Sequence, residues 1–156
     1  MARHPAATGE VRQMIILDTN VLSALMKPIP DPGAVAWLDN QPSESIWTTA
    51  VTVFEIEFGM ALLPAGRRRL RLQEIFGRVL HEELQDRILA FDHGAAVASA
   101  RLAADRQRAG RPVDFRDTEI AGIAIAHRAT VATRNVRHFS GMGVPVVDPW
   151  TALAGR

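Results

Sequence analysis

The sequence predicts an α/β fold in which helices cover both faces of a central parallel sheet. Short apolar runs alternate along the chain with longer stretches of helical spacing, and this alternation is typical of parallel sheets. The first run is apolar without interruption, as expected for a strand that is buried on both faces. With 156 residues, of which 47% are hydrophobic, the chain can form one domain around a sizeable core.

The N-terminal half contains two predicted strand-to-helix units. The run MIIL at residues 14–17 predicts the first strand, which ends at Asp18 and leads into a helix. The segment KPIP ends that helix, because proline cannot continue one, and Asp31 followed by proline opens the next. The second strand is predicted at residues 46–49. The predicted helices of this half are residues 19–26, 31–40 and 51–63.

The C-terminal half continues the alternation. A basic helix precedes the third strand, a loop at residues 110–113 separates two helices, and the last strand leads into the ending DPW. Residues 1–13 are small and polar without periodicity, so we expect a disordered N-terminal extension before a domain at residues 14–156. The predicted strands are residues 87–91, 130–133 and 144–147. The predicted helices are residues 67–82, 94–108 and 116–128.

Composition excludes several classes of function. The chain has no cysteine, which excludes a disulfide framework, a thiolate zinc site and a cysteine nucleophile. No apolar stretch approaches the roughly 20 residues that cross a bilayer, and the N-terminus lacks the apolar centre of a signal peptide. We therefore expect a cytoplasmic protein without membrane association. The net charge is only +1, although all but one of the 18 basic residues are arginine, which suits phosphate.

Four polar residues lie just after predicted strands or in the first turn or two of predicted helices. Asp18 ends the first strand, Glu55 lies one turn into the helix after the second, Asp117 opens the helix at 116–128, and Asn135 follows the strand at 130–133. Ligands gather at this edge of an open parallel sheet. Converging carboxylates need a cation, and an all-oxygen set suits Mg²⁺ or Mn²⁺. Such a site can activate water against a phosphodiester.

Each of these residues also has a purely structural interpretation. Asp18 and Asp117 can be helix N-caps, Glu55 an exposed helical residue and Asn135 part of a turn. Two further acids compete for any acidic role near the last helix. These are Asp114 and Glu119. The five histidines show no paired metal spacing, so they are interpreted as surface or loop residues; they are His4, His81, His93, His127 and His138.

Four sequence blocks together resemble the PIN-domain nucleases, most closely the VapC/FitB-type toxins of bacterial type II toxin–antitoxin systems. They read IILDTNVLS from Ile15, TVFEIEFG from Thr52, DTEIAGIA from Asp117 and ATRNVRHF from Ala132. The resemblance covers about residues 14–150 in order, so it is more specific than any single motif. It implies a PIN-like three-layer α/β domain with a central parallel sheet.

The resemblance also implies a site. Transferred to this chain, it makes Asp18, Glu55 and Asp117 the metal ligands and places Asn135 in the same catalytic site. Many family members have a fourth acid where this chain has Asn135. An amide oxygen brings no charge, so we expect a single firmly held Mg²⁺, with Mn²⁺ as an alternative ion.

Further polar residues near these ligands are expected to support the site. The resemblance implies this role for Thr19, Asn20 and Thr133. From placement alone, Arg134 or Arg116 could pair with an RNA phosphate or with an acidic residue of an antitoxin.

The function that the resemblance implies is that of a Mg²⁺-dependent endoribonuclease toxin that hydrolyses RNA, such as tRNA or rRNA. The family implies a homodimer that is silenced by a cognate antitoxin of the VapB/FitA kind in a heterotetramer or larger complex. DNA is then bound only through the antitoxin.

Two rival functions remain open at this point. A haloacid-dehalogenase-like phosphatase also uses Mg²⁺ and an Asp after the first strand, but it needs a second acid where Asn20 stands and a downstream lysine, whereas Lys27 is the only lysine. A non-catalytic PIN-like module for dimerisation or binding would need Asp18 and Asp117 only as caps. It would not need Glu55.

Overall fold

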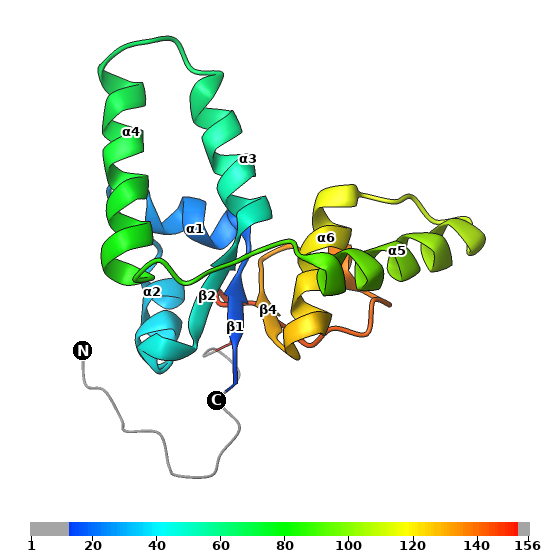
Figure 1. Cartoon of the computed structure of the whole chain (residues 1–156). Coiled ribbons are helices and arrows are strands. Elements are labelled where there is room, and N and C mark those ends of the chain that lie inside the picture. The colour runs from blue at the N-terminus through cyan, green and yellow to red at the C-terminus, as the bar shows by residue number, and fades with distance from the viewer. Residues whose placement is uncertain (1–12, 153–156) are drawn as a thin grey trace.

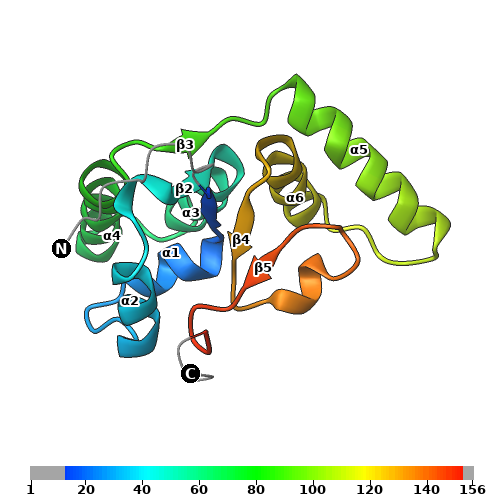
Figure 2. The same cartoon turned by 90° about the horizontal axis from the view of Figure 1, so that it is seen from below.

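The structure is a computed structural model that describes residues 13–152, and it confirms the predicted α/β fold. Five strands form one sheet in the order β3-β2-β1-β4-β5, and every neighbouring pair is parallel (Figures 1 and 2). The central strand β1 pairs with β4, and Leu17 lies opposite Ala132 at their carboxyl ends. The strands are β1 (Ile15–Leu17), β2 (Ile46–Thr49), β3 (Ile88–Leu89), β4 (Thr130–Ala132) and β5 (Val146–Val147).

All six helices predicted from the sequence are present. They are α1 (Thr19–Leu25), α2 (Pro32–Asp39), α3 (Ala50–Ala61), α4 (Arg67–Arg78), α5 (His93–Arg108) and α6 (Phe115–His127). Two short 3₁₀ turns at Ser43–Ser45 and Val136–Phe139 were not predicted, because a single turn has too few residues to show a period.

The predicted helix at residues 67–82 is wrong in its last turn. The α-helix ends at Arg78, and Val79–Glu83 form a wider π-helical turn in which the Leu84 N–H donates to the Val79 carbonyl oxygen at 3.0 Å. This turn directs both Val79 and Leu84 into the core. The third strand is also shorter than predicted, since only Ile88 and Leu89 pair with β2.

The sheet separates two hydrophobic cores, which makes the domain three-layered. Ile15 and Leu17 pack into one core together with residues of α1, α2 and α4, whereas Ile16 packs into the other together with residues of α5 and α6. Adjacent side chains of a strand point to opposite faces, so the uninterrupted apolar run of β1 serves both cores. The figures show α1, α2 and α4 on one side and α5 and α6 on the other (Figures 1 and 2).

Helices α5 and α6 approach each other closely at one glycine. A Cβ atom added to Gly122 would collide with the Ser99 hydroxyl and lie 2.7 Å from the Ala95 carbonyl oxygen. The Ser99 hydroxyl in turn donates to the Thr118 carbonyl oxygen at 3.2 Å. This contact fixes α6, whose first turn carries Asp117, against α5.

Residues 1–12 and 153–156 lie outside the described residues, so the predicted disorder of residues 1–13 remains a prediction. Gln13 is described, and its side-chain amide donates to the Thr130 hydroxyl at 3.0 Å. Within residues 13–152, no helix is long and apolar enough to span a membrane.

Candidate active site

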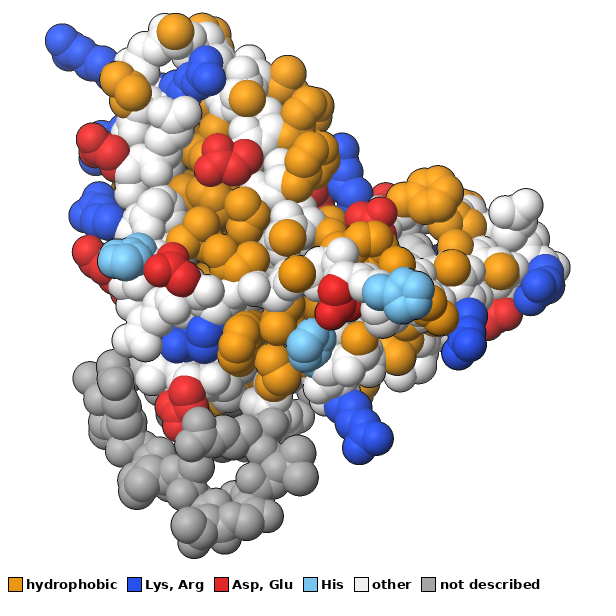
Figure 3. Space-filling view, in the orientation of Figure 1, with side chains coloured by type: hydrophobic (Ala, Val, Ile, Leu, Met, Phe, Trp, Pro, Cys, Tyr) orange, Lys and Arg blue, Asp and Glu red, His pale blue; other side chains and the backbone are white. Residues whose placement is uncertain are grey.

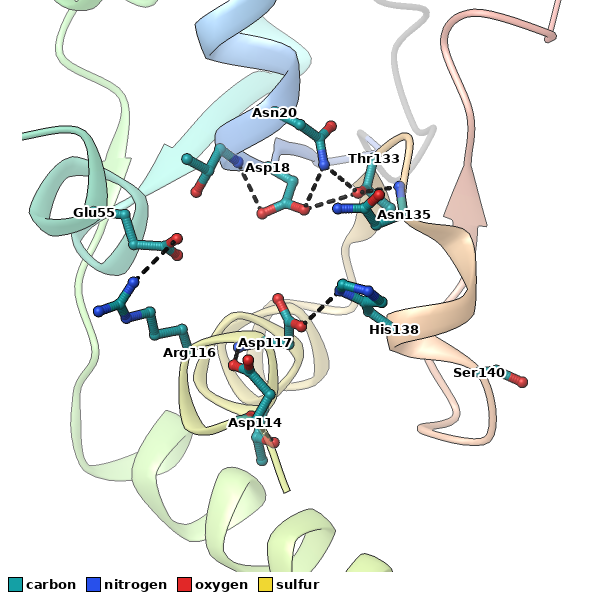
Figure 4. Close-up of polar contacts among 12 residues, drawn as sticks. Asp18, Asn20, Glu55, Asp114, Arg116, Asp117, Thr133, Asn135, His138 and Ser140 are labelled. Atoms are coloured by element: carbon teal, nitrogen blue, oxygen red, sulfur yellow. Dashed lines mark hydrogen bonds and ion pairs between the residues drawn. The ribbon is translucent and has the colours of Figure 1, made fainter. Parts of the chain in front are cut away.

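Asp18 lies at the carboxyl end of β1 and is only 5% exposed. Its backbone N–H donates to the Ala132 carbonyl oxygen at 2.9 Å, which ties it to the end of β4. One carboxylate oxygen accepts the Thr19 N–H at 2.8 Å and so caps α1. The other accepts the Thr133 hydroxyl at 2.8 Å and the Asn20 amide at 3.3 Å (Figure 4). Asp18 is therefore a cap, and it also faces the site.

Thr133 connects the polar ends of β1 and β4. It is fully buried, and besides donating to Asp18 its hydroxyl oxygen accepts the Asn20 amide and the Asn135 backbone N–H, both at 3.0 Å. The Asn20 side-chain oxygen Oδ1 accepts the Arg134 backbone N–H at 3.0 Å. The predicted supporting residues thus form one network that fixes the orientation of the Asp18 carboxylate.

Glu55 lies on α3, and its carboxylate faces Asp18 across the site (Figure 4). The helix is positioned by Thr49, whose hydroxyl accepts the Thr52 N–H at 3.1 Å and caps α3. The Glu55 side chain is 19% exposed, and its Oε2 atom lies 3.9 Å from the Arg116 guanidinium. Arg116 therefore partly neutralises Glu55 from the neighbouring helix α6.

Asp117 projects from the first turn of α6 toward Asp18 (Figure 4). The N-cap of this helix is Asp114, whose carboxylate accepts the Asp117 backbone N–H at 3.0 Å. The interpretation of Asp117 as an N-cap is therefore wrong, and its own carboxylate lines the cleft instead. Its Oδ2 atom lies 3.0 Å from Nδ1 of His138.

The three carboxylates share an unfavourable electrostatic environment. Burial raises the pKa of Asp18 above its ordinary value, although the Thr133 hydrogen bond opposes the shift. Burial, followed by the negative charge of Asp18, raises the pKa of Glu55. Burial and the charges of Asp114 and Asp18 likewise raise the pKa of Asp117. A positive ion between these groups would relieve the repulsion.

The donor set fits a hard divalent cation. The three carboxylates open into one cleft of about 540 Å³, with the lysine and arginine side chains of Lys27, Arg116 and Arg134 along it. Within residues 13–152, no three acidic or histidine side chains stand close enough together to enclose an ion by themselves. Mg²⁺ needs no such enclosure, because it usually binds proteins through one or two carboxylates and keeps several waters.

Comparison with known proteins identifies the fold family. A model of the PIN domain matches residues 15–143. The chain belongs to the PIN-domain family.

Relatives of this PIN domain place it among the VapC/FitB-type proteins, which confirms the resemblance stated above. It is similar to the VapC ribonuclease Y4jK of Sinorhizobium fredii, with 41% identity over 88% of this chain and 98% of that protein. It is also similar to toxin FitB of Neisseria gonorrhoeae, with 36% identity over 88% and 99%. The solved structure of FitAB bound to the IR36 DNA fragment matches with a TM-score of 0.79 and 36% identity, covering 88% of this chain and 96% of that one.

Asn135 lies at the same edge of the sheet as the three acids and is exposed to the cleft. Its backbone N–H bonds to Thr133, and it begins the 3₁₀ turn Val136–Phe139. Of the two competing acids, Asp114 lines the cleft of the PIN domain whereas Glu119 does not. Asn135 thus lines the same cleft as the three carboxylates.

One residue of the site was missed by sequence reasoning. His138 is a surface residue as expected, with its side chain 55% exposed, but it also contacts Asp117. The unpredicted 3₁₀ turn brings it back to the site, and the Arg106 guanidinium holds that turn by donating to the His138 and Ser140 carbonyl oxygens at 3.2 and 2.9 Å. The only signal in the sequence was its position three residues after Asn135.

Proposed function

We propose that this PIN domain is a Mg²⁺-dependent endoribonuclease that acts as the toxin of a VapBC-type toxin–antitoxin pair and hydrolyses RNA phosphodiester bonds. One observation carries the proposal. Asp18, Glu55 and Asp117 come from three distant segments and converge on one cleft, where burial raises the pKa of each. Such an arrangement costs stability unless a cation occupies it, so a structural role does not account for it.

Within this proposal, Asp18, Glu55 and Asp117 would hold one Mg²⁺, or Mn²⁺, partly through its bound waters, because the three carboxylates do not enclose an ion by themselves. Asn135 adds a neutral amide oxygen at the same edge. When bound, the ion would supply Lewis acidity and would lower the pKa of a coordinated water. The chain supplies rigidity, because Thr133 and Asn20 fix the Asp18 carboxylate. It also supplies opposing positive charge beside Glu55, through Arg116.

The names of relatives support RNA as the substrate. The tRNA(fMet)-specific endonuclease VapC of Shigella flexneri is 27% identical over 87% of this chain. The cleft itself carries Lys27 and Arg134, two exposed cations that can contact phosphates along a strand. We infer a structured RNA such as tRNA or rRNA as the target, in the cytoplasm.

The solved relatives support a protein partner. FitAB and the VapBC of Salmonella typhimurium were both solved bound to DNA, and the latter matches with a TM-score of 0.72 and 27% identity. We infer that a cognate antitoxin of the VapB/FitA kind silences this chain, that two copies of the chain pair in a heterotetramer or larger assembly, and that only the antitoxin contacts DNA.

A non-catalytic binding module is the second candidate, because one surface of the domain exposes three large aromatic side chains. Phe54 and Phe58 of α3 are 57% and 46% exposed and stack on each other, and Phe115 at the start of α6 is 69% exposed. Figure 3 shows apolar side chains gathered over α3 and the beginning of α6. This surface indicates a protein contact. It does not account for the carboxylates.

The phosphatase alternative finds no support in the cleft. Asn20 stands where that chemistry needs a second acid, and both ends of its side chain are already bonded, to Thr133 and to the Arg134 backbone. It therefore serves the Asp18 network.

The decisive experiment is cleavage of total bacterial RNA by the purified chain, with Mg²⁺ or with EDTA. Asp117→Asn removes one cleft charge, and Glu119→Gln on the same helix is the matched control, because Glu119 lies outside the cleft. We expect discrete Mg²⁺-dependent cuts from the wild type and Glu119→Gln but not from Asp117→Asn. Equal products from all three would indicate a contaminating nuclease. No products, together with no effect of Mg²⁺ on melting, would favour the binding module.

A further inference from the structure

Arg134 and Trp150 form a cation–π pair at the edge of the carboxylate cleft. Arg134 comes directly after Thr133 at the end of β4, and its guanidinium carbon lies 4.9 Å from the centre of the Trp150 ring. Both side chains line the cleft that contains Asp18 and Asp117. The pair therefore borders the place where a scissile phosphate would lie.

The pair is held in place from both sides. The Arg134 backbone N–H donates to Asn20, which belongs to the Asp18 network. The Trp150 backbone N–H donates to the Asp148 carboxylate at 2.9 Å, and its half-buried side chain packs against the core beneath α1 and α2. Because both residues are already positioned, a ligand would lose little conformational entropy in ordering them.

The Arg134 guanidinium has N–H donors that no carboxylate of the described residues engages in an ion pair. Within the described range 13–152, no carboxylate lies within ion-pair distance of it, in contrast to Arg116, whose guanidinium lies 3.9 Å from Glu55. The guanidinium lies over the indole ring, and the side chain is exposed. An unpaired, flat and prepositioned cation beside a phosphodiesterase site suits an unstacked base, which stacks on guanidinium planes and aromatic rings.

We propose that Arg134 and Trp150 form a nucleotide subsite in which a base of single-stranded RNA, next to the scissile phosphate, stacks on the outer face of the Arg134 guanidinium. Trp150 supports the guanidinium from beneath, and the edge of the guanidinium donates hydrogen bonds to the base or to its phosphate. The subsite rests on the proposed ribonuclease function and specifies how that site takes its substrate: at an unpaired nucleotide.

The experiment measures RNA binding without cleavage. The probes are a fluorescein-labelled single-stranded RNA and an abasic oligonucleotide of the same length, and the readout is anisotropy in EDTA. Arg134→Lys keeps the charge and removes the flat surface, whereas Arg134→Ala removes both. Arg137→Ala is the matched control, because Arg137 is exposed, lies three residues further along the chain and does not line the cleft.

Base stacking predicts that Arg134→Lys and Arg134→Ala each weaken RNA binding about tenfold, since one base stack is worth roughly that much or more. Arg137→Ala should weaken it far less. On the abasic probe, Arg134→Lys should bind like the wild type, because no base remains to stack. Trp150→Phe, which keeps an aromatic face, should retain more affinity for RNA than Trp150→Leu. Melting curves establish that each variant is folded.

Two results would overturn the subsite. Wild-type affinity of Arg134→Lys for the RNA would reduce Arg134 to a phosphate contact, and equal effects of Arg134→Ala and Arg137→Ala would reduce it to general surface charge. The ribonuclease proposal is tested separately, by measuring Mg²⁺-dependent cleavage of RNA by the wild type. A wild type that binds RNA through Arg134 without cutting it would refute the nuclease and leave only the stacking of a base on Arg134.

Discussion

Replacing Thr133 with valine tests the network that fixes Asp18. Valine keeps the shape of threonine but removes a hydroxyl that is fully buried and takes part in three hydrogen bonds: one to the Asp18 carboxylate, one from the Asn20 amide and one from the Asn135 backbone N–H. A hydrogen bond to a charged group contributes roughly 1.5–3 kcal/mol to stability, and a neutral one roughly 0.5–1.5 kcal/mol. Since Asn20 and Asn135 line the cleft and can bond to water instead, we expect Thr133→Val to lower the free energy of unfolding by about 3 kcal/mol.

Thr133→Ser is the matched control. It keeps the hydroxyl and removes one buried methyl group, so it should cost only about 1 kcal/mol. The order of stability in urea should therefore be wild type, then serine, then valine. The assay is equilibrium unfolding followed by circular dichroism, in EDTA so that no bound ion contributes.

The same substitution should alter the pH dependence of RNA cleavage. The Thr133 hydrogen bond lowers the pKa of Asp18 against the raising effect of burial, so its loss raises that pKa further. Protonated Asp18 cannot serve as a metal ligand. The acidic side of the pH–rate profile for RNA cleavage should therefore move to higher pH in Thr133→Val but not in Thr133→Ser. Equal stability of the two variants, or an unshifted acid limb in valine, would refute the role of the network.

Three further predictions follow from the packing and the charges. Because the folded-state pKa values of the cleft acids are raised, the folded chain binds more protons than the unfolded one as the pH falls, and the ionised acids cost stability at neutral pH. Asp117→Asn should therefore stabilise the metal-free protein near neutral pH by on the order of 1 kcal/mol, and urea titrations should show this gain shrinking toward about pH 4; a gain that is constant with pH would contradict it. Mg²⁺ should raise the melting temperature of the wild type by several degrees and that of Asp117→Asn by less, and identical shifts in calorimetry would rule out an ion held by Asp117. Gly122→Ala should lower the free energy of unfolding by about 1–3 kcal/mol or prevent folding, because the added Cβ would collide with Ser99 and Ala95. Gly59→Ala is the control, because its Cβ meets nothing within 4 Å, and it should raise the free energy of unfolding by up to about 1 kcal/mol.

Features that depend on neighbours in the sequence were determined by the sequence itself. The run MIIL has enough apolar residues to serve two cores, and the position of Asp18 directly after it makes that residue both the cap of α1 and a member of the site. The alternation of strands and helices gave the parallel sheet, because parallel neighbours require a crossover between them. The combined motifs identified the PIN family.

Only the tertiary structure decided which of several similar residues meet. Asp114 and Asp117 are equivalent as caps in the sequence, and only the path of the chain into α6 assigns the cap to Asp114 and frees Asp117 for the cleft. The contact of His138 with Asp117 depends on a single 3₁₀ turn held by Arg106, a residue of another helix. The contact of the Arg134 guanidinium with the Trp150 ring joins residues of separate segments. Such contacts are set by packing between elements, and packing leaves no period in the sequence.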